Sequence, residues 1–169
     1  MSRDEKKLEA ALLRLKSDRN AIADIYDLIG KAVYFTAYRI LHNESDAEDA
    51  LQNTMLALTE TAGAYRGGGA AAYVISVCKN QSMLILRKRK SFTPLEESGA
   101  SEEDDTAERL TMLDALKLLS EQDRDIVISH AVCQMKFKEI ADELGISEQA
   151  AQKRYVRALQ TLKKYYKER

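Results

Sequence analysis

The sequence predicts an all-α protein made of two small helical domains, and three observations carry this prediction. The 169 residues include one proline and seven glycines, so few positions interrupt a helix. Apolar residues recur every three or four positions over long stretches, which places them on one face of a helix. Residues 91–108 contain seven acidic side chains, the only proline and no basic residue, which is the composition of a linker. We therefore expect helical domains at 1–90 and 108–169, joined by an acidic linker at 91–107.

The first domain should begin with a short helix followed by a long one. The short helix is predicted by an apolar face made of Leu8, Ala11, Leu12 and Leu15. A longer apolar stripe predicts a second helix over about 20–42. The residues that should point inward from this second helix are Ile22, Ile25, Tyr26, Ile29, Val33, Ala37, Ile40 and Leu41.

A third and a fourth helix should complete the first domain. Ser45, followed three residues later by Glu48, matches a capping box, which predicts that the third helix begins near Asp46. Glycines and alanines then predict a loop at 63–71. The helical pattern resumes after this loop and predicts a fourth helix over about 72–89, which ends in a run of basic residues.

The second domain should contain a helix-turn-helix. Its helices are expected at about 107–119, 121–133, 137–144 and 148–167. Gly145 can adopt the positive φ that ends the third of these helices, and the hydroxyl of Ser147 can cap the next one. Ala141 is small where these two helices must cross. A helix-turn-helix places its second helix in the major groove of DNA, so the chain is expected to bind DNA.

The second helix of this unit has one apolar and one polar face. The inward face should consist of Ala151, Tyr155, Ala158 and Leu162. The opposite face carries Gln149, Gln152, Lys153, Val156, Arg157 and Gln160. Glutamine can pair with adenine and Lys or Arg with guanine, so Gln152, Lys153 and Arg157 are the expected base contacts. For Arg154 two roles stay open, a contact to a DNA phosphate and an ion pair at the edge of the core.

Several segments together resemble bacterial sigma factors. Residues 38–41 (Tyr-Arg-Ile-Leu), 46–52 and 73–80 stand ahead of a basic run, in the order and spacing of sigma region 2. Residues 119–124, followed by the helix-turn-helix, look like sigma region 4. Two such regions with a short linker and no third domain resemble the compact extracytoplasmic-function group. The resemblance covers roughly residues 8–165.

The resemblance implies a transcription initiation factor that binds core RNA polymerase and directs it to specific promoters. It implies contacts with the clamp helices of the largest polymerase subunit and with the flap, with promoter DNA, and with an anti-sigma factor that holds the protein inactive. The residues that it places against core polymerase are Asp46, Asp49, Gln52 and Asn53. The alternative for this polar face is a solvated helix surface whose acids lie near the helix N-terminus.

The resemblance also assigns two sets of DNA contacts. The loop at 63–72 would receive a base flipped out of the minus-ten element, and the next helix would hold the opened strand. Aromatic and cationic side chains suit that task, and the candidates are Tyr65, Tyr73, Lys79, Asn80, Arg87, Lys88 and Arg89. The candidates for the minus-thirty-five element are Lys136, Lys138, Ser147, Gln152, Lys153, Arg154, Val156 and Arg157.

Plainer interpretations stay open for these segments. The glycine-rich loop could be a simple connector, Tyr73 could be a core residue, and the basic run could be a solvated helix end. The acidic linker could be disordered in the free protein, or could follow the basic RNA-exit path of the polymerase, or both in turn.

Composition and motif spacing do not support catalysis, a metal site or a cofactor. His42 and His130 are isolated in the sequence, and Cys78 and Cys133 are expected to be reduced and buried, as in a cytoplasmic protein. No apolar run is long enough for a membrane span. Two other functions stay open: a dimeric DNA-binding regulator that needs no polymerase, and a sigma-like interaction protein that does not start transcription.

Overall fold

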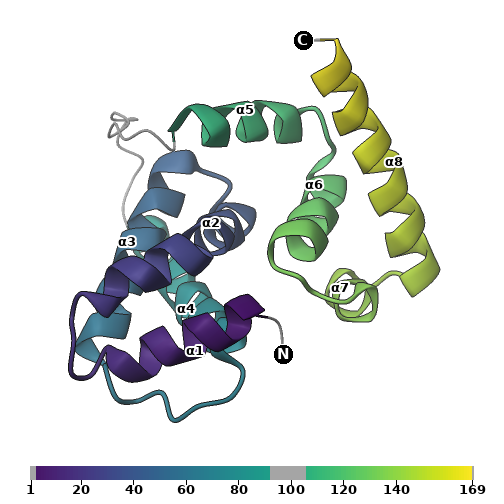
Figure 1. Cartoon of the computed structure of the whole chain (residues 1–169). Coiled ribbons are helices and arrows are strands. Elements are labelled where there is room, and N and C mark those ends of the chain that lie inside the picture. Colours follow the sequence, from purple (N-terminus) through teal and green to yellow (C-terminus); the bar gives the residue numbers. More distant parts are fainter. Residues whose placement is uncertain (1–2, 92–105, 169) are drawn as a thin grey trace. The chain divides into compact units, whose positions relative to one another are not determined.

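The computed structural model describes residues 3–91 and 106–168, and all regular structure within these residues is helical (Figure 1). The chain divides into two compact units, Met1–Ser98 and Gly99–Arg169, called here the N-terminal and the C-terminal unit. The all-α prediction is therefore confirmed for the described residues. Residues 92–105, which make up most of the predicted acidic linker, lie outside them.

Residues 3–91, the described part of the N-terminal unit, form four helices. They are α1 (Arg3–Arg14), α2 (Ala21–Leu41), α3 (Glu44–Glu60) and α4 (Ala70–Ser91). Helix α2 packs against the other three, and its side chains Ile25, Val33 and Phe35 are fully buried. Val74 and Cys78 of α4 complete the centre of this core. The Cys78 thiol donates to the carbonyl of Val33 over 3.3 Å, so α4 also meets the α2 backbone directly.

The structure corrects two details of the predicted N-terminal unit. The capping box at Ser45 is wrong, because α3 begins at Glu44 and is capped by Asn43. The Asn43 side-chain oxygen accepts the N–H of Asp46 at 2.9 Å, and Asn is as good an N-cap as Ser. Tyr26, predicted to point inward, is 40% exposed.

Helix α4 begins earlier than predicted. Ala70 is its first residue instead of Ala72, and Ala70 is buried. Small apolar residues such as alanine favour a helix, so the glycines alone form the end of the preceding loop. At the end of α2, His42 adopts a left-handed conformation (φ 53°) and its N–H donates to the carbonyl of Tyr38 at 2.8 Å. His42 is therefore a helix-end residue, as expected from its isolation in the sequence.

Over residues 106–168, the described part of the C-terminal unit, there are four α-helices and one turn of π-helix. They are α5 (Thr106–Lys117), α6 (Glu121–Val127), the π-turn Ile128–Val132, α7 (Phe137–Leu144) and α8 (Glu148–Lys167). The predicted helix at 121–133 therefore changes type midway. The N–H of Cys133 donates to the carbonyl of Ile128, five residues back, which is the bond of a π-helix. Cys133 is half-buried, so the prediction of buried cysteines holds for Cys78 only.

The predicted helix-turn-helix is confirmed in α7 and α8. Gly145 ends α7 in the left-handed region (φ 64°), and the Ile146 N–H donates to the carbonyl of Ala141 at 3.1 Å. The Ser147 hydroxyl accepts the N–H of Ala150 at 3.1 Å and so caps α8. Buried Ala141 and Ala151 allow the two helices to approach closely.

An aromatic cluster fixes α7 and α8 against the π-turn. The rings of His130 and Phe137 stack with centroids 4.0 Å apart, and Tyr155 lies edge-on to both. His130 Nδ1 is also 2.8 Å from the carbonyl oxygen of Met135. These contacts define the angle at which α8 is presented to solvent.

Candidate nucleic-acid interface

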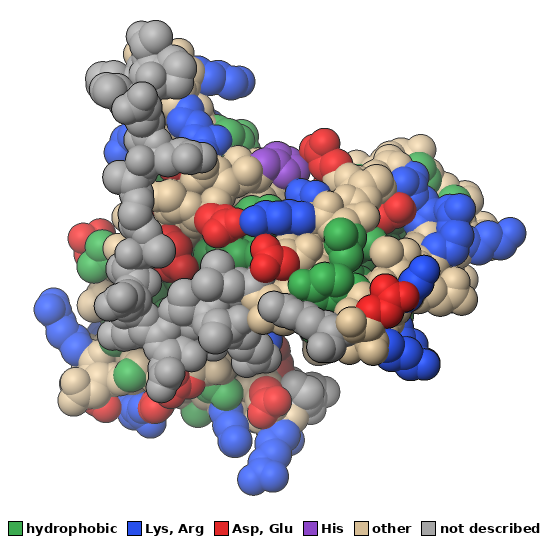
Figure 2. All heavy atoms as spheres, turned by 90° about the horizontal axis from the view of Figure 1, so that it is seen from above, with side chains coloured by type: hydrophobic (Ala, Val, Ile, Leu, Met, Phe, Trp, Pro, Cys, Tyr) green, Lys and Arg blue, Asp and Glu red, His purple; other side chains and the backbone are tan. Residues whose placement is uncertain are grey.

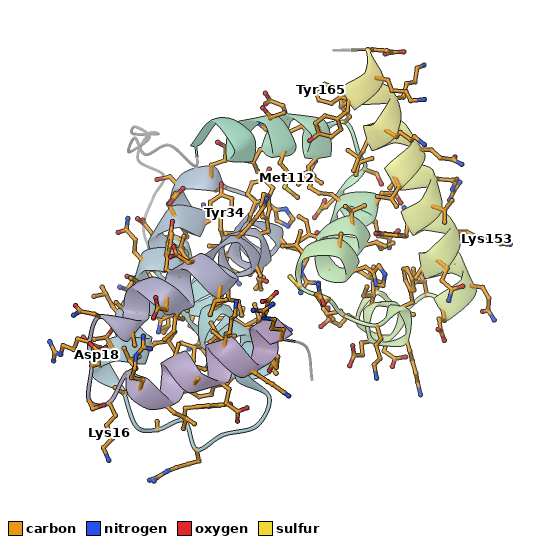
Figure 3. The ribbon with its side chains drawn as sticks, in the orientation of Figure 1. Lys16, Asp18, Tyr34, Met112, Lys153 and Tyr165 are labelled. Carbon is orange, nitrogen blue, oxygen red and sulfur yellow. The ribbon has the colours of Figure 1, made fainter. Side chains whose placement is uncertain are left out.

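The polar face of α8 is exposed over its whole width. Its side chains are those predicted from the sequence: Gln149, Gln152, Lys153, Val156, Arg157 and Gln160 are all exposed. Lys153 points away from α6 and α7 (Figure 3). Val156 is an apolar side chain that is 53% exposed among these polar ones. Such a face, on the second helix of a helix-turn-helix, has the shape and chemistry to contact base edges in a major groove.

Arg154 belongs to the interior edge of the unit. Its Nε donates to Oδ1 of Asp123 at 2.6 Å, and its guanidinium also donates to the Gln122 side chain. The ion-pair alternative is therefore the one found, and the pair joins α8 to the first turn of α6. Burial by itself would raise the pKa of Asp123, but hydrogen bonds from Arg154 and Ser120 and the charges of Arg154 and Arg157 outweigh it. The pKa of Asp123 therefore lies below its ordinary value.

The other predicted contacts of this unit surround the turn. Lys136 and Lys138 are exposed at the start of α7, where the Lys136 N–H donates to the Glu139 carboxylate at 2.8 Å. Ser147 is exposed, but its hydroxyl is engaged in the cap of α8. Figure 2 shows that Lys and Arg side chains gather on the exposed side of the C-terminal unit, at the right of the view. This distribution suits a phosphate backbone.

A second exposed face lies on α3 of the N-terminal unit. Asp49, Gln52 and Asn53 are exposed and fall on one stripe of the helix. Leu56, which was not among the predicted contacts, continues this stripe and is 60% exposed. Its spacing of four residues from Gln52 was the available signal. The α3 face, defined as these four side chains, therefore combines polar groups with one large apolar group.

Asp46 and Arg89, each predicted to contact a different partner, form an ion pair with one another. Arg89 also donates from a terminal guanidinium nitrogen to the carbonyl of Leu41 at 3.2 Å. These contacts tie the end of α4 to the junction of α2 and α3. The neighbouring cations Arg87 and Lys88 are exposed on α4. They remain the better candidates for contacts with DNA.

The glycine-rich loop before α4 and its two tyrosines form the third region of interest. Gly67, Gly68 and Gly69 have φ values of 104°, 81° and 61°, which favour glycine. Tyr65 is only 8% exposed, and its ring centroid lies 5.1 Å from that of the half-buried Tyr73. Tyr65 therefore packs against Tyr73, and Tyr73 is the more exposed of the two.

The remaining predicted contacts of α4 differ in exposure. Asn80 is exposed, whereas Lys79 is half-buried. Among residues 3–91 and 106–168, no cluster of His, Cys, Asp and Glu side chains could hold a metal ion. No helix within these ranges is long and apolar enough to cross a membrane.

Comparison with known proteins shows which protein family contains these surfaces. The family model of sigma-70 region 2 matches residues 25–92, and the model of sigma-70 region 4 matches residues 109–162. Together the two matches span more than half of the chain. The chain belongs to the sigma-70 family. The first match contains α3 and α4, and the second contains the helix-turn-helix, so each exposed face lies within a sigma region.

A relative with a curated name agrees with that assignment. This sigma factor is 27% identical to the RNA polymerase sigma factor CarQ of Myxococcus xanthus over 154 residues, which cover 86% of this chain and 88% of CarQ. A solved structure of CnrH in complex with the cytosolic domain of CnrY aligns with 97% of each chain, with a TM-score of 0.49 and 19% identity. The protein is a sigma factor of the extracytoplasmic-function group. It binds core RNA polymerase and directs it to promoter DNA.

Proposed function

We propose that this sigma factor divides promoter recognition between its two units. In the C-terminal unit, Gln152, Lys153 and Arg157 contact bases of the minus-thirty-five element in the major groove. Val156 lies between them and suits the methyl group of a thymine. The observation that carries the proposal is the exposure of these side chains on one face of α8, within the match to region 4. Arg154 is left out because Asp123 and Gln122 engage it.

Lysines around the turn hold the DNA backbone in this proposal. Lys136 and Lys138 are exposed at the start of α7 and carry no sequence information themselves. Their binding to phosphates releases counterions, so promoter affinity falls as salt rises. Ser147 acts indirectly, by capping α8 and so fixing the position of its first turn.

In the N-terminal unit, the α3 face docks on the clamp helices of the largest polymerase subunit. Asp49, Gln52 and Asn53 supply polar contacts, and Leu56 supplies the apolar centre that protein interfaces commonly have. Asp46 is left out of direct contact because it pairs with Arg89. Its role is to hold α3 and α4 in a fixed relation.

Helix α4 and the loop before it hold the opened minus-ten strand. Tyr73 offers a ring for stacking, and Arg87 and Lys88 offer a cationic track for phosphates. Asn80 and Lys79 lie on α4 between these ends. The loop at 63–69 receives one flipped base. Each unit binds its own promoter element weakly. Once polymerase holds both units, binding of one element raises the effective concentration of the other at its site, so the affinity for the whole promoter increases.

The protein acts by binding and not by catalysis, and it works in the bacterial cytoplasm, where polymerase and promoter DNA are found. An anti-sigma factor that covers both units is the expected regulator, and the polymerase flap is the expected second docking site for the C-terminal unit. These statements rest on membership of the family.

Promoter variants separate the two proposed DNA contacts. On the natural promoter, holoenzyme carrying Lys153→Ala should bind about 5- to 100-fold more weakly than the wild type. On a promoter in which the base contacted by Lys153 is altered, the wild type and Lys153→Ala should bind equally. Lys167→Ala, which removes an exposed lysine at the other end of α8, is the matched control. An equal loss on every promoter would instead make Lys153 a phosphate contact. Sensitivity of Lys153→Ala to bases of the minus-ten element would contradict the proposed division.

A further inference from the structure

Two carboxylates of α1 bind the loop that precedes α4 and the first turn of α4 itself. Glu9 accepts the N–H of Gly68 at 2.9 Å, and Glu5 accepts the N–H of Ala71 at 3.1 Å. The two glutamates are four residues apart, so they lie on the same side of α1, and both are half-buried. Figure 1 shows the loop between α3 and α4 passing alongside α1. Helix α1 itself precedes the match to sigma region 2, which begins at residue 25.

The loop needs partners of this kind because it can do little to fix itself. Gly67, Gly68 and Gly69 have no side chains, and all three have positive φ. The first N–H groups of α4 have no acceptor within the helix, and the helix dipole makes this end positive. A carboxylate satisfies both needs. The oxygen that accepts the Gly68 N–H, Glu9 Oε1, also lies close to Gly67, because a Cβ added at Gly67 would be 3.3 Å from it.

The same two carboxylates act on Tyr65, a residue of the loop itself. Burial, followed by the charges of Glu9 and Glu5, raises the pKa of Tyr65. The Tyr65 ring packs against that of Tyr73, with the ring centroids 5.1 Å apart. The loop, the first turn of α4 and the exposed part of Tyr73 are therefore held as one assembly by α1.

We propose that Glu5 and Glu9 are positioning residues that hold the glycine-rich loop in the shape that selects the flipped base. This inference rests on the proposed function of the loop. The glutamates touch no base, and their negative charge does not favour DNA. Their contribution is specificity. Gly67, Gly68 and Gly69 have no side chains, so base selection in this part of the loop depends on where the backbone groups at 67–71 stand, and the two carboxylates hold two of those N–H groups.

Substitutions at Glu9 separate positioning from charge. Glu9→Ala removes both the acceptor and the charge, whereas Glu9→Gln removes the charge but keeps an acceptor for Gly68. The measurement is the affinity of holoenzyme for fluorescent single-stranded DNA that carries the minus-ten element, with each base varied in turn. The base preference is the ratio of the affinities for the best and the worst base at one position. We expect Glu9→Ala to reduce the largest such ratio about 2- to 10-fold, which is the effect of losing one hydrogen bond. Glu9→Gln should keep most of the preference.

A matched control and a second site guard against loss of structure. Asp4→Ala removes an exposed carboxylate from the same helix and should change nothing. Glu5→Ala should act in the same direction as Glu9→Ala. Thermal unfolding of each variant, compared with the wild type, identifies any variant that fails to fold. If Glu9→Ala fails to fold, Glu9→Asp is measured in its place. Aspartate keeps the charge but shortens the reach, so it too should weaken base preference.

The outcomes distinguish this inference from the proposed function. A wild-type protein without base preference in this element would contradict the proposed function of the loop, and the inference with it. A wild-type preference that persists in folded Glu5→Ala and Glu9→Ala would overturn the inference alone. An equal rise in affinity for every strand in Glu9→Gln and Glu9→Ala, with preference intact, would overturn it too, because the carboxylates would then only repel DNA.

Discussion

Arg154 of α8 donates from Nε to Oδ1 of Asp123 at 2.6 Å, across 31 residues of chain. The two side chains are 26% and 28% exposed, so solvent screens this ion pair less than one on the surface. The pair joins the second helix of the helix-turn-helix to the first turn of α6. Arg154, the cation beside Lys153, therefore stabilises the unit, whereas the exposed Lys153 is the one proposed to contact DNA.

Replacing Asp123 should make the C-terminal unit less stable in a pH-dependent way. The folded-state pKa of Asp123 is below its ordinary value, so its ionisation stabilises the fold above about pH 4. That contribution is lost as the pH falls through the folded pKa. Asp123→Asn should lower the free energy of unfolding by about 1–3 kcal/mol at pH 7, and the difference should shrink below pH 4.

Unfolding of the full chain, followed through NMR signals of α8 between pH 7 and pH 2.5, measures this effect. Asp114→Asn is the control, because Asp114 is 55% exposed in its 3.7 Å pair with Lys117. A difference between Asp123→Asn and the wild type that stays constant down to pH 2.5 would show that ionisation of Asp123 is not its source.

The cap of α3 can be tested with two neighbouring residues. Asn43→Ala removes the acceptor for the Asp46 N–H and should cost about 1 kcal/mol of unfolding free energy. Ser45→Ala changes an exposed side chain in the first turn and should cost little. Denaturant titration of the two variants compares them directly. If Ser45→Ala were the more damaging change, the capping box predicted from the sequence would be the operative one.

Leu56 and Leu58 should separate binding from stability within one helix. Leu56→Ala should leave unfolding unchanged but weaken binding of core polymerase at least about 5-fold, as expected for an apolar side chain near an interface centre. Leu58 is 2% exposed, so Leu58→Ala should cost about 2–5 kcal/mol of unfolding free energy. The measurements are titration of core polymerase with labelled sigma factor, and thermal unfolding. If Leu56→Ala bound core polymerase as tightly as the wild type, the proposed docking of the α3 face on polymerase would be contradicted.

Gly145 should tolerate a side chain only at a conformational cost. A Cβ at this position would meet no atom within 4 Å, so the penalty of Gly145→Ala comes from its positive φ alone. We expect about 1–2 kcal/mol, with a smaller loss for Gly145→Asn because Asn adopts this conformation more readily. Unfolding of the C-terminal unit, followed through α8 in the full chain, measures both. Equal stability of the Ala and Asn variants would show that φ is not the limiting factor.

Local signals in the sequence were enough to predict the helix-turn-helix. Gly145 and Ser147 each act on the residues beside them, so the bounds of α7 and α8 could be predicted closely. The prediction of the α3 start was wrong because two nearby residues, Asn43 and Ser45, are both good N-caps. The structure shows that Asn43 is the cap. The outward face of α8 was predictable because a helix of known start has a known periodicity.

Pairs distant in sequence could not be predicted. Asp46 and Arg89 stand on different helices, and each looked available to a separate partner until the structure paired them. The contacts of Glu5 and Glu9 with the loop depend on how α1 packs, which no local pattern specifies. Burial of Tyr65 has the same origin. The Asp46–Arg89 pair and the burial of Tyr65 changed which side chains are candidates for binding polymerase or DNA.

Transcription in vitro with sigma-free core polymerase from the same organism, on fragmented genomic DNA, is the first test of initiation by this sigma factor. We expect discrete transcription starts that share two upstream elements at a fixed spacing, and loss of these starts when the sigma factor is omitted. Binding to core without any starts would contradict this expectation and indicate a sigma-like interaction protein. Failure to bind core, with binding to duplex DNA as a dimer, would contradict it in favour of an ordinary DNA-binding regulator.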